Sequence, residues 1–259
     1  MKDMKEKTKI AVVMAAGKGT RMKSDLPKVL CEVCGRPMIE YVLDTLEKAG
    51  VDRIVIVVGY RSDLVREMLA HRKNLEYAEQ SEQKGTGHAV MMARPSIAGH
   101  DGPLFVVAGD CPMIRADSIK GLLAEYERAE YKRESVSCVM GTAFKDDPKG
   151  LGRIVRDADG NFLRIVEEKD ATEEQRKITE VNMSYYLFHA PDLFGVLDHL
   201  KTDNVQGEYY ITDAPAVLLE QGKKVVAIPI LKPIEGLGVN NEAELEIVNC
   251  AMKELLTQT

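Results

Sequence analysis

Runs of apolar residues alternate with segments of helical periodicity along the first half of the chain. Three runs, within 9–14, 53–60 and 104–110, are almost continuously apolar and rich in valine. Such runs are typical of strands in a parallel sheet that is covered on both faces. Between the first two, residues 36–50 carry apolar side chains at helical spacing. The alternation predicts an α/β fold: a doubly wound, Rossmann-like, mostly parallel sheet with helices on both faces.

The segment at 36–50 also has signals for where a helix begins and ends. Pro37 suits a first helical turn, and Gly50 suits the position after the last turn. A second helix is predicted at 63–70, with Ser62 as its capping residue. The first helix should bury one apolar stripe, made of Ile39, Val42, Leu43 and Leu46.

The pattern changes after about residue 116. Residues 152–168 predict two strands joined by a turn at 157–161, and therefore an antiparallel hairpin. Further strands are predicted at 183–190 and 224–230. Helical periodicity continues in three later segments, at 191–200, 211–222 and 241–256. The second half should therefore combine antiparallel strands with helices.

Neither a repeat of fixed period nor a low-complexity linker divides the sequence. We therefore expect one domain over residues 1–259. It would comprise a nucleotide-binding half at about 9–115, a second half at about 116–250 and a C-terminal tail at 251–259.

Composition and net charge limit the classes of protein to which this chain can belong. The chain is 45% hydrophobic and 29% charged, as in ordinary soluble enzymes. Its net charge of −6 gives no broad basic field for a nucleic acid or an anionic membrane, so we expect neither partner. No run is long enough to span a bilayer, and the charged N-terminus has no signal-peptide pattern. These features predict a cytoplasmic protein. A mildly acidic protein of this kind can bind phosphates only through a local positive site.

The cysteines and histidines do not form a metal-binding pattern. Five cysteines are scattered along the chain, unlike a secreted disulfide framework. Cys31 and Cys34 have C-x-x-C spacing, but no second Cys or His pair stands at a suitable distance for zinc. A redox motif and small structural cysteines both remain open.

A glycine-rich loop at 15–22, AAGKGTRM, follows the first predicted strand. A P-loop would need lysine after Gly19, where this chain has Thr20. A dinucleotide fingerprint would need its third glycine at Met22. The remaining ligand-binding option is a nest of backbone N–H groups that holds an anion.

Cations stand where such an anion would need them. Lys18, Arg21 and Lys28 lie in or just after the loop. Pro27 fixes its own φ and biases Leu26 toward an extended backbone, so Lys28 should be presented at a defined position. From these residues alone, a phosphate site and a tight turn with solvated cations are both open.

The full string at 15–30, AAGKGTRMKSDLPKVL, resembles the signature of the sugar-1-phosphate nucleotidyltransferases. Other segments resemble the same family and follow its order. They are 79–90 (EQSEQKGTGHAV), 106–114, 150–172, 180–188, 204–213 and 235–241. The set covers about residues 9 to 250, and GEYYITD favours the N-acetylglucosamine-1-phosphate uridylyltransferase branch. The resemblance implies the GT-A type of Rossmann-like fold, with the hairpin in a sugar-binding lobe.

The resemblance also implies a reaction and roles for residues. UTP and N-acetylglucosamine 1-phosphate would form UDP-N-acetylglucosamine and pyrophosphate, with Mg²⁺ as cofactor. Arg21 and Lys28 would be catalytic, and Gln80 would read uracil, because an amide can both donate and accept. The full set implied to bind the nucleotide is Ala15, Ala16, Gly17, Gly19, Thr20, Gln80, Gln83, Gly85 and Thr86.

The implied metal ligands are Asp110 and Asn240. Asp110 ends an apolar strand, where ligands of open α/β sheets bind, and Mg²⁺ prefers oxygen ligands. From the residues alone, Asp110 as a turn former and Asn240 as a helix cap stay open. The residues implied to hold the sugar are Gly109, Gly152, Glu167 and Asn182, with Glu168 as the competitor of Glu167 because a strand alternates its faces.

The chain departs from the family pattern at several positions. Met14 replaces leucine, and Cys111 follows Asp110 where relatives often have valine or alanine. Ala108 stands where some relatives have a bulkier residue, which would change the contact near the sugar. Ser184 stands where relatives often have glycine, which would narrow the site near the N-acetyl group. Two alternatives are therefore kept: a relative that uses another sugar 1-phosphate or nucleotide, and a non-catalytic sugar-nucleotide sensor.

Many members of the family continue into a β-helix with acetyltransferase activity. This sequence has no hexapeptide repeat, so we expect no acetyl-CoA site. Trimers of the family form largely through that part, so a monomer or weak dimer is expected.

Overall fold

The valine-rich runs of the first half form the parallel part of a nine-stranded sheet. Strands β1 (Ile10–Met14), β4 (Arg53–Val58), β5 (Leu75–Glu79) and β6 (Pro103–Ala108) pair in parallel, in the order β6-β1-β4-β5. This computed structural model describes residues 7–22, 24–132 and 134–257, so the ends of the expected domain lie outside the described residues. The parallel, Rossmann-like core predicted from the sequence is confirmed.

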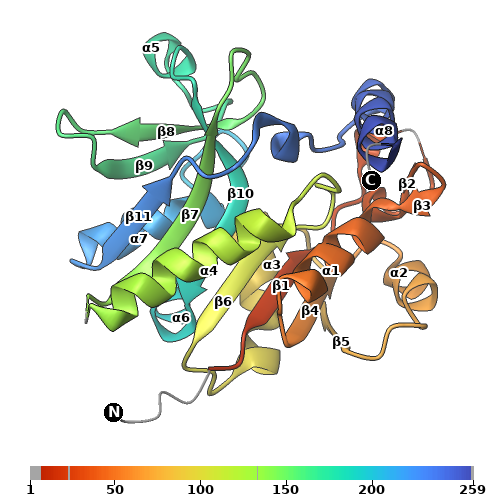
Figure 1. Ribbon diagram of the computed structural model, residues 1–259, viewed down its shortest axis with the longest axis horizontal. Coiled ribbons are helices and arrows are strands. Elements are labelled where there is room, and N and C mark those ends of the chain that lie inside the picture. The colour runs from red at the N-terminus through yellow and green to blue at the C-terminus, as the bar shows by residue number, and fades with distance from the viewer. Residues whose placement is uncertain (1–6, 23, 133, 258–259) are drawn as a thin grey trace.

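Antiparallel pairing joins the second half to the same sheet. Strand β10 (Glu180–His189) runs antiparallel to both β6 and β7 (Val136–Phe144). Strand β11 (Lys224–Ile228) extends the sheet beyond β7 and pairs with it in parallel. The predicted hairpin is present as β8 (Gly152–Arg156) and β9 (Phe162–Val166), and β8 also pairs with β10. Figure 1 shows this hairpin projecting from the edge of the sheet that lies away from β1.

Helices cover both faces of the sheet (Figure 1). One face carries α1 (Met38–Lys48) and α4 (Ala116–Tyr131). The other carries α3 (Thr86–Ala93), α6 (Ala190–Leu197) and α7 (Ala214–Glu220). The remaining helices and short strands are α2 (Ser62–Met68), α5 (Glu173–Arg176), α8 (Glu242–Thr257), β2 (Glu32–Val33) and β3 (Arg36–Pro37).

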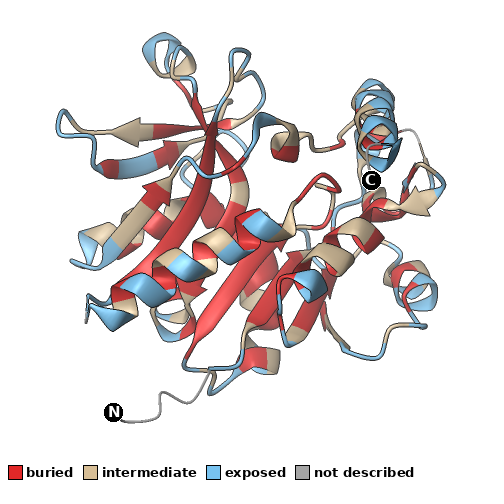
Figure 2. Cartoon of the chain, viewed as in Figure 1, coloured by how far each residue is buried: buried red, intermediate tan, exposed pale blue. Residues whose placement is uncertain are grey.

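Strand alternation divides the core between these faces. In β1, Ala11 and Val13 join the apolar cluster under α1 and α4, whereas Ile10 and Val12 join the cluster under α3, α6 and α7. The four residues of the predicted α1 stripe are all fully buried. A third, smaller cluster packs α8 against β2 and the start of α1. Figure 2 shows the central strands buried and the outer helix faces exposed.

Two predicted helix starts differ from the structure. Helix α1 begins at Met38, because Pro37 still has an extended backbone (ψ 136°). Helix α2 begins at Ser62 itself, after Arg61 in the left-handed region (φ 47°). Ser62 is therefore inside the helix and gives no side-chain cap, so that prediction was wrong. Gly50 follows α1 with φ +84°, as predicted.

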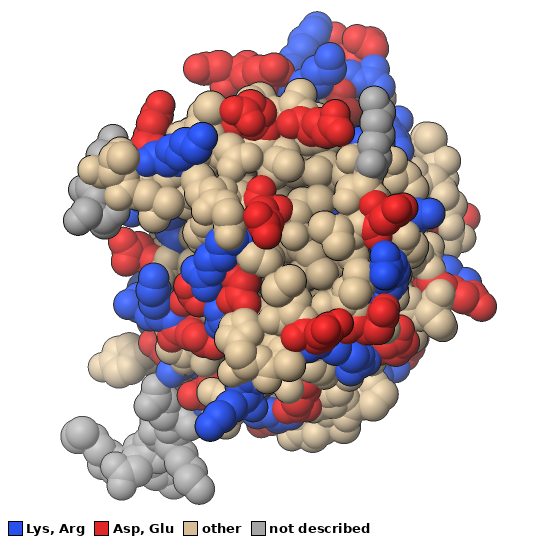
Figure 3. Space-filling model, turned by 90° about the vertical axis from the view of Figure 1, so that its right-hand side faces the viewer, with Lys and Arg blue, Asp and Glu red and all other residues tan. Residues whose placement is uncertain are grey.

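None of the helices in the described ranges is long and apolar enough to cross a membrane. On the face that carries α2 and α8, acidic and basic side chains are interspersed (Figure 3). This face therefore offers no broad basic surface.

Candidate active site

A cavity of about 930 Å³ opens where β1 and β6 end. Its walls come from the glycine-rich loop, the segment before α3, strand β10 and the segments that precede α7 and α8. A smaller pocket of about 280 Å³ adjoins it along the loop. Ligands of open α/β sheets bind at this carboxyl edge of the strands.

Most of the residues predicted for the site line this cavity. They are Ala15, Ala16, Gly17, Arg21, Lys28, Gln80, Gln83, Gly85, Thr86, Asp110, Glu167, Asn182 and Asn240. Gly19 and Thr20 line the smaller pocket. Gly109 and Gly152 lie just behind the wall, where a Cβ on Gly109 would be 3.1 Å from the Met14 carbonyl oxygen and one on Gly152 would be 2.9 Å from Ile165.

The glycine-rich loop folds back onto the lysine that follows it. Gly19 has φ +66°, and a Cβ there would be only 2.8 Å from Cβ of Lys28. Glycine is therefore needed for this close approach. The Gln83 side chain donates to the Ala16 carbonyl at 3.0 Å and ties the loop to the segment before α3.

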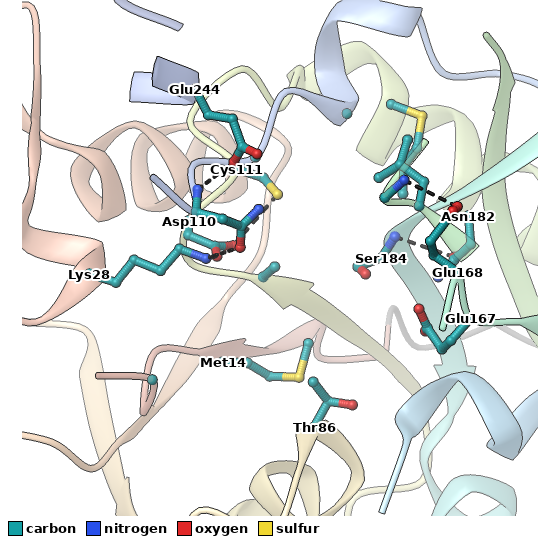
Figure 4. A pocket seen from close by; sticks show the side chains of 18 of the residues that line it. Met14, Lys28, Thr86, Asp110, Cys111, Glu167, Glu168, Asn182, Ser184 and Glu244 are labelled. Carbon is teal, nitrogen blue, oxygen red and sulfur yellow. Dashed lines mark hydrogen bonds and ion pairs between the residues drawn. The ribbon is translucent and has the colours of Figure 1, made fainter. Parts of the chain in front are cut away.

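Lys28 connects the two residues proposed as metal ligands. Its ammonium pairs with the Asp110 carboxylate and donates to Asn240 Oδ1 at 2.7 Å. Arg21 donates to the same Asn240 oxygen at 3.3 Å. Figure 4 shows Lys28 and Asp110 on one side of the cavity, opposite Asn182 and Ser184. The side-chain oxygens of Asp110 and Asn240 thus converge on one position, which the Lys28 ammonium occupies.

The backbone holds Asn240 so that its side chain faces this position. The Asn240 N–H donates to Glu244 Oε2 at 2.6 Å, and Val239 N–H donates to the Asp110 carbonyl at 3.3 Å. The helix-capping bond at the start of α8 comes from Asn241, whose side chain accepts from Glu244 N–H at 2.9 Å. Asn240 is therefore not needed as the cap. Glu244 was not predicted, and its position four residues after Asn240 was the only signal in the sequence.

Cys111 contributes packing beside this cluster. Burial, together with the nearby Asp110 carboxylate, raises the pKa of the Cys111 thiol well above its usual value. A protonated thiol is a poor nucleophile and a poor metal ligand. Among the described residues, no group of three or more His, Cys, Asp or Glu side chains could hold a metal.

Gln80 lies at the end of β5 and is buried, with 3% of its surface exposed. Its side-chain nitrogen donates to the Gly85 carbonyl at 3.1 Å and lies 3.0 Å from Nδ1 of His88. An exposed strand-end amide is thereby excluded. His88 belongs to the same motif but was not singled out from the sequence.

The segment that leads into α3 is held against the segment at 204–213. Gly85 has φ +102°, and a Cβ there would be 2.5 Å from the Tyr209 carbonyl oxygen. Gly87 N–H donates to that carbonyl at 2.7 Å, and Ile211 N–H donates to the Thr86 hydroxyl at 3.0 Å. Tyr209 itself packs against the core, whereas Tyr210 lines the cavity.

The two glutamates after β9 have different surroundings. Glu168 accepts from Arg153 at 2.7 Å and from Gly150 N–H at 3.2 Å. Glu167 is set deeper, and burial, with Asp213 and Asp170 nearby, raises its pKa. Burial also raises the pKa of Asp213 to about 6. Glu168 is thus occupied by structural contacts, while Glu167 faces the cavity with no ion-pair partner among the described residues.

A bulge in β10 shapes the wall opposite Lys28. The pairing of β10 with β7 shifts between Asn182 and Tyr185, and Ser184 lies in the left-handed region with φ 59°. The buried Asn182 amide donates to the Tyr186 hydroxyl at 2.7 Å and accepts from Ser184 N–H at 3.3 Å. Lys145 and Lys149, which no motif marked, add positive charge to the rim.

This carboxyl-edge cavity, with its glycine-rich loop and convergent cations, defines an α/β nucleotidyltransferase domain. The family model described as "MobA-like NTP transferase domain" matches residues 11–203, and the chain belongs to that family.

Curated relatives match almost the whole chain. The bifunctional protein GlmU of Clostridium acetobutylicum is 43% identical over 251 residues, covering 96% of this chain and 53% of the relative. GlmU of Brevibacillus brevis is 43% identical over 244 residues, covering 94% of this chain and 51% of the relative. The chain thus spans about half the length of these relatives. The predicted resemblance is confirmed.

Solved structures share the fold. A crystal structure of UDP-glucose pyrophosphorylase complexed with UDP-glucose superposes with a TM-score of 0.77 at 19% identity, covering 95% of this chain and 99% of that chain. The apo form of UDP-glucose pyrophosphorylase superposes with a TM-score of 0.75 at 18% identity, covering 95% of this chain and 98% of that chain. At such low identity these likenesses support the fold alone.

Proposed function

We propose that this domain transfers the uridylyl group of UTP to N-acetylglucosamine 1-phosphate, forming UDP-N-acetylglucosamine and pyrophosphate. The convergence of Arg21, Lys28, Asp110 and Asn240 carries the proposal. It lies beside the loop pocket and faces the Asn182 wall across one continuous cavity. The order of the motifs and the identity to GlmU proteins support the choice of substrates.

The reaction needs charge neutralisation more than proton transfer. A phosphate monoester has a second pKa of about 6, so the sugar phosphate carries its attacking oxygen already ionised near neutral pH. That oxygen forms a bond to the α-phosphorus of UTP, and the bond from the α-phosphorus to the bridging oxygen breaks, releasing pyrophosphate. The barrier is repulsion between anions, which Lys28 and Arg21 lower while the loop N–H groups hold the leaving phosphates.

The donor set of the cluster fits Mg²⁺. Asp110 and Asn240 each offer a side-chain oxygen, and both oxygens already converge on the Lys28 ammonium. Mg²⁺ is commonly held by one or two protein oxygens together with phosphate oxygens and waters. Asp110 and Asn240 would hold the ion, which would supply positive charge shared between the two substrates.

The opposite walls account for recognition of the base and the sugar. Gln80 offers its side-chain amide to the base, and Gly85 lets the turn beside it pack closely on the backbone of Tyr209. Glu167 and Asn182 would hold the sugar, since a carboxylate accepts from hydroxyls and an amide can donate and accept. Gly152, behind this wall, lets β8 approach closely.

One observation favours a different sugar phosphate as the substrate. Ser184 places a side chain on the sugar-side wall, where glycine would leave more room. Glucose 1-phosphate, which lacks the N-acetyl group, would need less space there.

Pyrophosphate release with Mg²⁺, over a grid of nucleoside triphosphates and sugar 1-phosphates, tests the proposal. Release confined to UTP with N-acetylglucosamine 1-phosphate would support it. Release with UTP and glucose 1-phosphate would move the sugar assignment to the second candidate. Tight binding of UDP-sugars without release from any pair would replace the enzyme with a sensor. Lys28→Ala is the matched inactive control, with Lys48→Ala, an exposed lysine at the end of α1, as the neutral one.

A further inference from the structure

The orientation of the Gln80 amide is fixed by a backbone carbonyl. The Gly85 carbonyl oxygen lies 3.1 Å from the Gln80 side-chain nitrogen. A carbonyl can only accept a hydrogen bond, so the group that faces it must be the NH₂ and not the oxygen. This assignment does not depend on any neighbouring side chain.

The second partner of that NH₂ group defines the state of His88. Nδ1 of His88 lies 3.0 Å from the same nitrogen. Two donors cannot share such a contact, so Nδ1 must carry the lone pair. The ring is therefore neutral, with its proton on Nε2. With Gly85 and His88 as partners, both amide hydrogens of Gln80 are bound.

We propose that His88 is a positioning residue that makes Gln80 an obligate hydrogen-bond acceptor for the base. This inference rests on the proposed function and deepens it. Because both hydrogens are occupied, Gln80 can offer only its carbonyl oxygen to a ligand. Uracil presents a ring N3–H to such an oxygen, whereas cytosine presents a lone pair at N3 and is repelled. The donor to a uracil carbonyl, which the sequence assigned to Gln80, must then come from another group.

The fold holds the two partners rigidly. Gln80 directly follows β5, and its backbone N–H donates to the Val58 carbonyl at 2.8 Å. His88 lies in the first turn of α3, directly after Gly87, whose N–H donates to the Tyr209 carbonyl. A Cβ on Gly87 would be 2.8 Å from the Leu200 side chain, so the start of α3 has little room to shift. The histidine ring therefore stays within reach of the amide.

The test compares two substitutions at one position. His88→Leu removes one of the two acceptors of the Gln80 NH₂ group at similar size. Only the Gly85 carbonyl then holds that group, so the amide can leave it and turn its NH₂ toward cytosine more readily. We expect the ratio of kcat/KM for UTP over CTP to fall about tenfold or more, mainly through KM for UTP. His88→Asn can offer an oxygen near the position of Nδ1 and should restore most of the discrimination. If His88 had a purely structural role, both substitutions would lower kcat/KM for UTP and CTP alike. The Leu and Asn variants would then show the same discrimination.

A double variant identifies the route. If His88 acts through Gln80, His88→Leu should change the ratio no further in a Gln80→Ala background. Full discrimination in a folded His88→Leu protein would overturn the inference, as would equal discrimination losses in the Leu and Asn variants.

Failure of the proposed function would appear separately, as no pyrophosphate from any pair in the wild type. In that case, calorimetric binding of UTP and CTP to the wild type and both variants still decides the role of His88. Equal affinity of the wild type for the two nucleotides would count against it.

Discussion

The Lys28 ammonium donates to the side-chain oxygen of Asn240 at 2.7 Å, although the two residues are 212 positions apart in the sequence. The same ammonium pairs with Asp110. Lys28 thus holds together the two oxygens that we propose as ligands of Mg²⁺. A divalent ion can use both oxygens only when Lys28 moves toward the phosphates, so nucleotide and metal should favour each other's binding.

Removal of this lysine should strengthen metal binding to the free protein. Lys28→Met deletes a competing cation next to both ligands, and we expect the affinity for Mn²⁺, without nucleotide, to rise about tenfold. Titration followed by electron paramagnetic resonance measures free Mn²⁺ directly. The double variant Lys28→Met/Asp110→Asn should lose this gain in Mn²⁺ affinity, because it lacks one of the two proposed ligands. An unchanged or weaker affinity in Lys28→Met would contradict the arrangement.

The same lysine should be needed for the reaction. Lys28→Ala removes the positive charge that we propose faces the α-phosphate, and we expect kcat/KM to fall by about 10²–10³. Continuous pyrophosphate detection gives the rate. Lys48→Ala should stay close to wild type, since Lys48 is exposed at the end of α1. Comparable rates in the two variants would remove Lys28 from the mechanism.

Ser184 provides a test of the bulge in β10. Its φ of 59° suits glycine and is poorly suited to a β-branched residue. We expect Ser184→Val to lower the free energy of unfolding by about 2 kcal/mol. Ser184→Gly should stay within about 1 kcal/mol, because relief of strain is offset by the greater freedom of the unfolded chain. Urea unfolding measures both. Equal losses would mean that the backbone is not strained there. If Ser184 narrows the sugar site, Ser184→Gly should also raise the preference for N-acetylglucosamine 1-phosphate over glucose 1-phosphate.

Asp213 should make stability fall as the pH rises. Burial raises its pKa from 3.8 to about 6 in the folded protein. Between these values the unfolded chain has released the proton while the folded protein still holds it. The unfolded state therefore binds fewer protons, and this group's contribution to stability decreases from about pH 4 to 6. Asp213→Asn should stabilise the protein more at pH 7 than at pH 4.

Urea unfolding at the two pH values checks the sign for Asp213. The exposed Asp203→Asn variant serves as the control. A gain for Asp213→Asn that is the same at both pH values, or larger at pH 4, would refute the assignment.

The strands with continuous apolar runs could be predicted because both of their faces are buried. Strand β5 could not, since LEYAE lies at the sheet edge and only Ala78 is buried in it. Helix α4 was missed because charged residues interrupt its apolar stripe, which is buried through Ile119, Leu122, Tyr126 and Ala129. Ser62 was misassigned because its side chain suits a cap, whereas the left-handed backbone of Arg61 sets the helix start one residue earlier.

The residues of the candidate site could be proposed from motifs, but their contacts could not. Nothing local in the sequence joins Lys28 to Asn240, because the sheet topology brings them together. The choice of Glu167 over Glu168 depended on register, and the structure gives a reason in the pairing of Glu168 with Arg153. His88 went unnoticed because a lone histidine has no signal until its neighbour's amide is seen.

Gly85 links two segments that evolution would otherwise be free to vary separately. Its missing side chain lets the turn before α3 rest on the carbonyl of Tyr209, within the stretch at 204–213. Mutations that altered the backbone of that stretch, to admit a different sugar, would also disturb the turn beside Gln80. Changes of sugar preference should therefore accumulate on β10 and the β8–β9 hairpin, where they leave nucleotide choice intact.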